Sequence, residues 1–457
     1  MKMPFSIRLR NKLTPTRIIF LGFILLILVG ALLLMLPISH KKTEDISFLD
    51  ALFTATSASC VTGLVVKDTN STWTGFGEGV ILLMMQIGGL GVMSLFTLFV
   101  LITGKRINLK DRLMLKESTN NFTLSGSFRL FLKILIVTLC FELLGAVILF
   151  SQFGPLYGIK DGIWKSIFHS VSAFCNAGFD IFGTENYKFQ SLTLVSNNPV
   201  ILMTLASLII IGGLGFVVWK DIWNNKFNLK KYSLHSKIVL ISTFILIVGG
   251  AVLFYYLEAD NANTIKPMTF TNKISNCLFQ SITSRSAGFA SLNPSNMTQA
   301  SNFFTIILML IGAAPGSTGG GIKVTTISVL ILASIFFIIG RKDVQVMKNT
   351  IPEQMIYKAI CIFMLALLLL FIGTSILLIH NPNLDFLDVL YETASAISTS
   401  GFSIGVTTQL DSISKIVLMM LMFLGRLGPL TAIITFSQRQ KISSAPYRYS
   451  DGKIAVG

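Results

Sequence analysis

Charged residues are scarce in this chain. Only 13% of its 457 residues are Asp, Glu, Lys or Arg, whereas 52% are hydrophobic. Soluble domains carry about 25% charged residues, and disordered chains combine high charge with low hydrophobicity. The composition therefore excludes a soluble enzyme and a disordered scaffold. The apolar runs are also too long and too continuous for the roughly 10-residue strands of a membrane barrel. We expect an all-α polytopic membrane protein.

Cysteine and histidine motifs are missing too. The five cysteines form no CxxC pair, and the four histidines show no HExxH spacing. This argues against a disulfide framework and a zinc site. The segment Gly316–Lys323 (GSTGGGIK) does not have the GxxxxGK[ST] spacing of a phosphate loop, and no nucleophile elbow occurs. We expect no enzyme activity, no covalent cofactor, and no nucleotide site on this chain itself.

Long apolar runs are what the chain does have. Eight runs are uncharged or nearly so: Ile18–Leu36, Val80–Ile102, Ile134–Phe150, Val200–Trp219, Ile238–Leu257, Phe303–Gly340, Ala359–Ile379 and Ile416–Phe436. A membrane-spanning helix needs roughly 20 such residues. The sixth run has 38 residues and is interrupted by the glycine-rich segment Gly312–Gly321. That segment cannot be helical, and at membrane depth it must be buried in protein or line a cavity.

The 37 Lys and Arg residues outnumber the 21 Asp and Glu residues, which gives a net charge of +16. Most of the basic residues lie in alternate connections: the N-terminus, 104–133, 220–237, 341–358 and the tail from 439. By the positive-inside rule both termini are cytoplasmic in a multi-pass protein of the cell membrane. The basic loops then orient the chain and attract anionic lipid, and no nucleic acid partner is expected.

A short motif recurs four times between the apolar runs. It begins with an aromatic residue, is rich in Ser, Thr and Ala, and ends in Gly followed by Phe or Leu. Its copies are Phe53–Leu64, Phe168–Phe179, Phe279–Phe289 and Tyr391–Phe402. The motif glycines are 115, 110 and 113 residues apart. We predict four tandem repeats of span, re-entrant pore helix, glycine loop and span, at 1–104, 105–225, 226–342 and 343–440, with a cytoplasmic tail at 441–457.

Four such repeats can close around a central pore. The C-terminal end of each pore helix carries a partial negative charge, and the backbone carbonyls that follow can replace the hydration shell of a cation. No carboxylate lies at any of the predicted filter positions, which favours a monovalent cation, K⁺ or Na⁺, over a divalent one. The predicted filter residues are Val61, Thr62, Gly63, Asn176, Ala177, Gly178, Ser286, Ala287, Gly288, Thr399, Ser400 and Gly401.

The four loops, the segment Gly316–Lys323, the motif Gly425–Leu430 (GRLGPL) and the tail Tyr447–Gly457 resemble the Trk/Ktr/HKT cation transporter superfamily. The resemblance covers essentially the whole chain and is greatest to the pore-forming subunit of the bacterial Ktr potassium uptake system. It implies channel-like K⁺ uptake, since a Gly in all four loops accompanies K⁺ selectivity and a Ser in the first accompanies Na⁺ transport. It also implies a homodimer, a cytosolic nucleotide-binding regulatory ring, and stimulation by Na⁺ in many members.

The same resemblance implies a gate below the filter. It maps onto Gly312, Pro315, Gly316, Ser317, Thr318, Gly319, Gly320 and Gly321, with Lys323 next to them and Arg426 in the eighth run. Arg426 either pairs with backbone carbonyls or forms a positive barrier in the pore, and the resemblance favours the barrier. Arg285 is expected to brace the pore helices. Glu142 is the one clear mid-span carboxylate, and it is either in an ion pair or a proton or Na⁺ site.

Two other functions remain open from the residues. One is a Na⁺-permeable or Na⁺-coupled transporter of the same superfamily. The other is a secondary transporter of organic solutes, which would use inverted repeats and buried polar ligands near the membrane midplane. The repeats here share one orientation, and mid-span carboxylates are nearly absent. Both features disfavour the organic-solute transporter.

Overall fold

The computed structural model describes residues 15–41, 45–91, 127–226, 228–341 and 343–428, and these are mostly helical. The expected cytoplasmic N-terminus, most of the basic loop 104–133 and the tail 441–457 lie outside the described residues. The helices are α2 (Pro15–Leu34), α3 (Phe48–Cys60), α4 (Thr69–Thr72), α5 (Gly75–Leu90), α8 (Ser127–Cys175), α9 (Pro199–Gly213), α10 (Phe216–Asn225), α11 (Leu234–Glu258), α12 (Phe270–Thr283), α13 (Gln299–Leu310), α14 (Val324–Ile338), α15 (Glu353–His380), α16 (Phe386–Ser398) and α17 (Ser412–Leu427).

Short elements complete the described chain. Four single 3₁₀ turns lie at Thr193–Val195, Leu229–Lys231, Pro294–Asn296 and Val406–Gln409. Strands β1 (Gln345–Val346) and β2 (Asn349–Thr350) form an antiparallel hairpin between α14 and α15.

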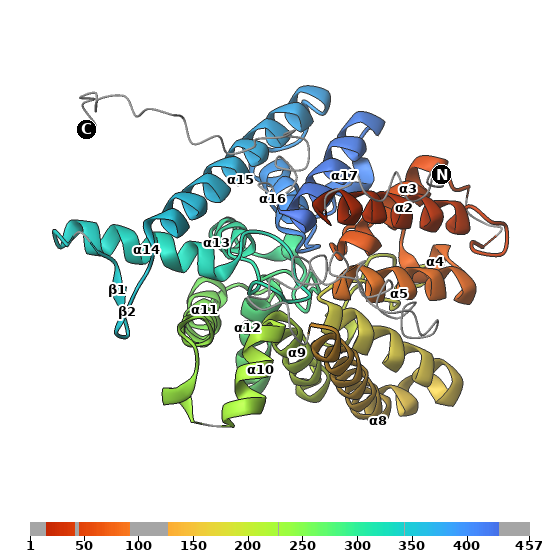
Figure 1. Cartoon of the computed structure of the whole chain (residues 1–457). Helices are drawn as coiled ribbons and strands as arrows, with labels where there is room; N and C mark the ends of the chain where they lie inside the picture. The colour runs from red at the N-terminus through yellow and green to blue at the C-terminus, as the bar shows by residue number, and fades with distance from the viewer. Residues whose placement is uncertain (1–14, 42–44, 92–126, 227, 342, 429–457) are drawn as a thin grey trace, which may run out of the picture.

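The helices follow one another around a closed circle. In Figure 1 the chain passes from α2 and α3 through α8, α11 and α15 to α17, around a central region of loops. Four packing contacts join consecutive parts of the circle: α5 with α8, α9 with α12, α13 with α16, and α17 with α3. The last contact brings the C-terminal quarter of the described chain against the N-terminal quarter. The four loops that contain the motif glycines therefore face the same centre.

Local sequence fixes where many of these helices begin and end. Asp411 caps α17 by accepting a hydrogen bond from the Ser414 amide (3.0 Å), and Asn198 followed by Pro199 starts α9 in the same way. Glycines in the left-handed region stop α5 and α17, with φ of 84° at both Gly91 and Gly428. L-residues with a Cβ rarely adopt that conformation, so glycine is the residue expected there.

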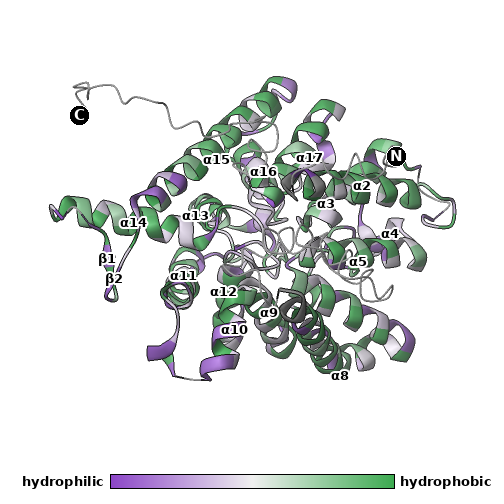
Figure 2. Ribbon diagram, viewed as in Figure 1, coloured by the Kyte–Doolittle hydropathy of each residue, from purple (hydrophilic) through white to green (hydrophobic). Residues whose placement is uncertain are grey.

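The outer surface of the circle is apolar. On α8, Leu143 and Val147 are 64% and 68% exposed, and Figure 2 shows hydrophobic residues along most of the outward-facing helices. Among the described residues, three helical segments are long and apolar enough to cross a membrane: Leu132–Cys175, Leu234–Glu258 and Glu353–His380. Such a surface is stable against lipid, and the chain is a membrane protein. The count of eight spans stays a prediction, because several other apolar helices are shorter.

One expected span differs from the structure. The fourth run was expected to be one helix from Val200 to Trp219, but α9 and α10 meet at a bend of 93°. Gly215, with φ of 87°, turns the backbone there. The third run was expected to be followed by a separate short helix, and α8 is indeed two helices that meet at Gly158, where φ of 80° and ψ of 171° are not helical. Hydropathy did not reveal the bend at Gly215, because the residues on both sides of it are apolar.

The predicted interruption of the sixth run is confirmed. Helix α13 ends at Leu310 and α14 begins at Val324, with no regular helix between them. Arg426 lies in the last turn of α17, and the rest of the eighth run, from residue 429, lies outside the described residues.

Candidate functional site

Each of the four predicted loops follows the C-terminal end of a helix that points toward the centre of the circle. After α3, α8 and α16 the first loop residue is left-handed, and paired backbone hydrogen bonds close the helix end. One example is the pair from Val61 to Ala58 (3.1 Å) and from Thr62 to Ser57 (2.8 Å). This is the usual glycine-type helix stop, formed here by non-glycine residues. The left-handed residues are Val61, Asn176 and Thr399, with φ of 57°, 58° and 50°.

The third loop is built differently. Its motif is one residue shorter than the others, and α12 already ends at Thr283. The amides of Ala287 and Gly288 both donate to the Thr283 carbonyl, and the left-handed residue is Ser286. The shorter turn compensates for the missing residue and places Gly288 level with the other glycines.

The four motif glycines form a closed ring. A Cβ placed on Gly63 would lie 2.4 Å from the Ala177 carbonyl oxygen of the next loop. The same relation continues from Gly178 to Ala287 (2.4 Å), from Gly288 to Ser400 (2.2 Å) and from Gly401 back to Thr62 (2.2 Å). All four glycines have positive φ, between 71° and 93°. No side chain fits at any of them, so backbone carbonyls surround the centre.

Buried hydroxyl groups hold the ring loops against their own helices. The Ser57 hydroxyl accepts from the Gly63 amide (3.1 Å), and the Ser172 hydroxyl donates to the Phe179 carbonyl (2.8 Å). In the third loop Thr283 donates to the Phe289 carbonyl (3.0 Å), and in the fourth the Ser395 hydroxyl accepts from Ser400 (3.3 Å). The Ser and Thr residues of the motif therefore fix the loop backbone, which a carbonyl site for an ion requires.

A second pair of braces was not predicted from the sequence. His169 and Glu392 each follow the motif's aromatic residue, and each accepts from the amide three residues after the ring glycine. The His169 Nε2 accepts from Ile181 (3.4 Å), and Glu392 accepts from Ile404 (3.2 Å). Glu392 is fully buried and also accepts from the hydroxyls of Ser403 (2.5 Å) and Thr407 (2.6 Å). The shared position in the aligned motifs is the signal that could have identified them.

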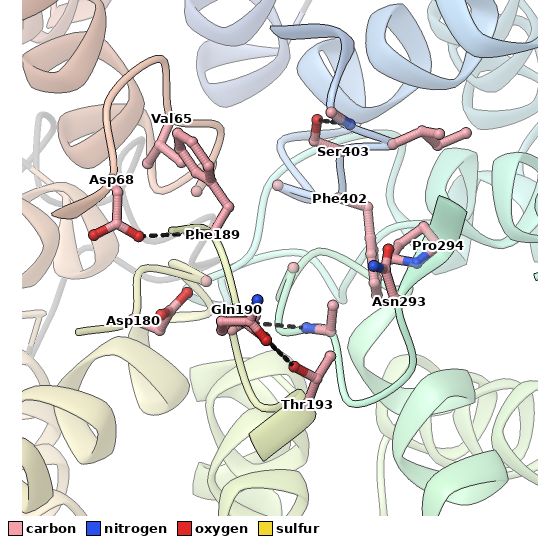
Figure 3. A pocket seen from close by; sticks show the side chains of 18 of the residues that line it. Val65, Asp68, Asp180, Phe189, Gln190, Thr193, Asn293, Pro294, Phe402 and Ser403 are labelled. Carbon is pink, nitrogen blue, oxygen red and sulfur yellow. Dashed lines mark hydrogen bonds between the residues drawn. The ribbon is translucent and has the colours of Figure 1, made fainter. Parts of the chain in front are cut away.

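A cavity of about 300 Å³ opens on one side of the ring and is lined by all four glycines. Two carboxylates, Asp68 and Asp180, contribute to its wall (Figure 3). Asp68 accepts from the amides of Ser71 and Phe189, both at 2.8 Å. Burial, together with the charge of Asp68, raises the pKa of Asp180 to about 7. Lys188 also lines the cavity, so two carboxyl groups and one ammonium group lie next to the ring.

The segment between α13 and α14 lies on the other side of the ring. A Cβ on Gly320 would lie 2.1 Å from the Thr399 hydroxyl, and one on Gly321 would lie 2.8 Å from the Ser398 carbonyl. Thr318 donates through its hydroxyl to the Phe174 carbonyl (3.0 Å) and through its amide to Gly212 (3.2 Å). Thr399, Ser398 and Phe174 come just before the ring glycines in their loops, whereas the cavity is lined by residues just after those glycines. The ring thus separates the cavity from this segment.

Three basic residues surround this segment and the pore helices. Arg426 donates to the carbonyls of Thr318 and Gly88, and to that of Gly89 at 3.0 Å. Lys323 begins α14 and donates to the Gly319 carbonyl (2.7 Å). Arg285 is buried, and its Nε has no hydrogen-bond partner among the described residues, so its expected bracing role stays a prediction.

The structure brings the predicted residues into two adjacent groups. The twelve predicted filter residues lie in the four loops that form the ring, and the predicted gate residues lie on the side of the ring opposite the cavity. Arg426 contacts both the interrupted segment and α5. Within the residues that the structure describes, no group of three or more His, Cys, Asp or Glu could hold a metal ion.

Comparison with known proteins gives consistent matches over nearly the whole chain. The family model described as TrkH, cation transport protein, matches residues 12–445. The chain is 37% identical to the potassium/sodium uptake protein NtpJ of Enterococcus hirae, over 98% of this chain and 99% of that protein. It is also 37% identical to the Ktr system potassium uptake protein B of Bacillus subtilis, over 98% and 97%. The crystal structure of the potassium transporter TrkH from Vibrio parahaemolyticus superposes with a TM-score of 0.70 at 18% identity, covering 93% and 84% of the two chains.

Proposed function

Because the chain belongs to the TrkH family of cation transport proteins, we propose that it takes up K⁺ across the cytoplasmic membrane through the ring of four glycine loops. It is a transport protein of the membrane and not an enzyme. The observation that carries the proposal is the closed ring, in which each glycine abuts the carbonyl of the next loop. Stacked carbonyls of this kind replace the water around a monovalent cation.

The outer cavity supports the same path. Its negative side chains favour entry of a cation, and its floor is the ring itself. An ion that passes the ring would next meet the segment 312–321, which is packed against the ends of the helices. We therefore assign this segment and Arg426 as the gate that must move for conduction.

The relatives' names suggest Na⁺ as an alternative cargo. One relative is a potassium/sodium uptake protein. The four ring positions include no carboxylate. The first of them is Gly63, and a residue with a side chain there would displace the neighbouring carbonyl groups. We propose K⁺ as the main substrate, with Na⁺ either admitted or stimulatory.

Partner subunits follow from two relatives that are named as Ktr system proteins. We propose that this chain forms a homodimer and binds a cytosolic nucleotide-binding ring, which would supply the nucleotide control that the chain itself does not encode. The described basic connection 220–237 is a candidate contact, and it carries Lys220, Lys226, Lys230, Lys231 and Lys237. Neutralising these lysines should weaken binding of the cytosolic nucleotide-binding subunits. Cation flux through an open pore should stay the same.

The experiment is cation flux into liposomes that contain the purified protein, with K⁺, Rb⁺ and Na⁺ gradients compared. Gly63→Ser tests the ring, because a Cβ there would press on the Ala177 carbonyl. Gly79→Ser is the matched control, since a Cβ at Gly79 meets no atom within 4 Å. We expect K⁺ and Rb⁺ flux in the parent and the control, and Na⁺ flux as well in Gly63→Ser. Equal selectivity in all three proteins would refute the assignment of the filter.

A further inference from the structure

Glu142 is a buried carboxyl group that the transport path does not use. It lies on α8, where its neighbours Leu139 and Leu143 are 54% and 64% exposed on the outer, apolar face. Glu142 itself is only 5% exposed and faces inward, toward α5 and the second half of α8. Carboxyl groups in such a position are rare because the charged form is strongly disfavoured away from water.

The hydrogen bonds of this carboxyl group are incomplete. Its Oε2 accepts from the Gln86 amide (3.2 Å), but its Oε1 has no partner among the residues that the structure describes. The hydroxyl of Thr138 is also fully buried and lacks a described partner. Thr138 lies four residues before Glu142 on the same helix, so the two side chains are neighbours on one face. Neither group finds a partner in the other, so Oε1 of Glu142 has no hydrogen-bond donor among the described residues.

No described positive charge compensates Glu142. Helix α9, which packs on α8, contains no charged residue. Helix α5 contains only Glu78, whose carboxylate accepts from the Trp164 ring nitrogen at 2.5 Å. Arg426 lies near the end of α5, but its guanidinium is bound to the carbonyls of Gly88 and Gly89. An ionised carboxylate here would be both buried and unpaired, which is the costliest state for such a group.

We propose that Glu142 is an intramembrane proton-binding site, in which Oε1 carries the proton while Oε2 accepts from the side-chain amide of Gln86. The proton comes from solution and returns to it, and no other bond changes. This inference does not depend on the proposed ion path.

The site is connected to the ring by two hydrogen bonds. The side-chain oxygen of Gln86, Oε1, accepts a hydrogen bond from the Cys175 thiol (3.4 Å). Cys175 directly precedes Asn176 of the second loop. Deprotonation would strengthen the bond from Gln86 to the carboxylate, because charged acceptors bind more strongly. The position of the Gln86 side chain, and with it the thiol of Cys175, therefore follows the protonation state of Glu142.

Infrared spectroscopy of the purified protein in lipid tests the site without any flux measurement. At neutral pH, the spectrum of the parent minus that of Glu142→Gln should show the carbonyl stretch of a protonated carboxyl group. Gln86→Met should keep this band but move it to higher frequency, because the carbonyl oxygen loses its donor. The control Glu185→Gln, which changes an exposed acid in a loop, should leave the band in place.

A spectrum of Glu142→Gln that equals the parent's at every pH where both are folded would overturn the proposal. So would a carboxylate band at Glu142 that responds to Na⁺ or K⁺ and not to pH. The Gln86→Met variant keeps the proposal testable if Glu142→Gln does not fold. For the connection to the ring, the S–H stretch of Cys175, identified with Cys175→Ala, should shift over the pH interval in which the carboxylic acid band disappears. A constant S–H frequency would refute that connection.

Discussion

Arg426 donates a hydrogen bond to the carbonyl oxygen of Thr318, and this bond fastens the interrupted segment beneath the glycine ring to the end of α17. The same guanidinium also binds the carbonyls of Gly88 and Gly89 at the end of α5. One side chain thus ties three parts of the circle together on the inner side of the ring. The residues alone left open whether Arg426 binds carbonyls or forms a barrier. The structure shows the carbonyl contacts, and they allow it to restrain the gate as well.

Arg426→Ala should increase flux through the reconstituted protein. The substitution removes a positive charge and frees the Thr318 carbonyl, so the segment should leave the ring more readily. Loss of one charge-assisted hydrogen bond corresponds to about 1.5–3 kcal/mol, and we expect at least a tenfold gain in Rb⁺ flux. Arg426→Lys should give an intermediate rate, because an ammonium group cannot form the forked contact. Unchanged or lower flux at equal protein content would contradict the role of a restraint.

Glu392→Ala should loosen the fourth ring loop. The amide of Ile404 and the hydroxyls of Ser403 and Thr407 would lose their common acceptor. An unsatisfied buried polar group costs about 1–3 kcal/mol, so the melting temperature in detergent should fall, and discrimination of K⁺ from Na⁺ should fall with it. Glu392→Gln keeps one acceptor oxygen and should lose less of both. Selectivity equal to that of the parent in Glu392→Ala would show that the brace does not shape the ring.

Acidification outside should weaken K⁺ uptake at low K⁺ concentration. The pKa of Asp180 is raised to about 7 by burial and by Asp68, so its carboxylate is charged above this pH and neutral below it. The cavity therefore loses negative charge as the pH falls through about 7, and the apparent KM for K⁺ should rise. Asp180→Asn should have a high KM that no longer depends on pH in this range. Glu185→Gln should behave as the parent, and an Asp180→Asn profile that matches the parent's would exclude Asp180 as the cause.

Sequence repetition predicted the convergence of the four loops, because each loop has a glycine nine or ten residues after an aromatic residue. The ring contact between Gly401 and the Thr62 carbonyl joins residues 339 positions apart, and only the repeat pattern indicated it. The interruption after Leu310 was predicted for a physical reason as well, since a run of glycines does not sustain a helix. The assignments of these residues as filter and gate stay predictions until ions are observed.

Other features could not be read from the sequence. Glycines in an apolar run are compatible with a continuous membrane helix, so the bend at Gly215 was hidden. His169 and Glu392 accept hydrogen bonds from loop amides, and these bonds form only because the loop folds back against its helix. The sequence pattern does not show that a loop folds back in this way. The hydrogen bonds of Arg426 also come from three distant segments. In each case a tertiary contact decided the outcome, and local propensity carried no information about it.

The most direct test of the central claim is to locate the ion. Crystals of the protein grown with Tl⁺ or Rb⁺ in place of K⁺ should show an anomalous scattering peak on the axis of the glycine ring. The account predicts this peak within coordination distance of carbonyl oxygens from all four loops, among them those of Thr62, Ala177, Ala287 and Ser400. A ring without a peak, in crystals where the ion is bound elsewhere in the protein, would contradict the claim that these loops form the filter.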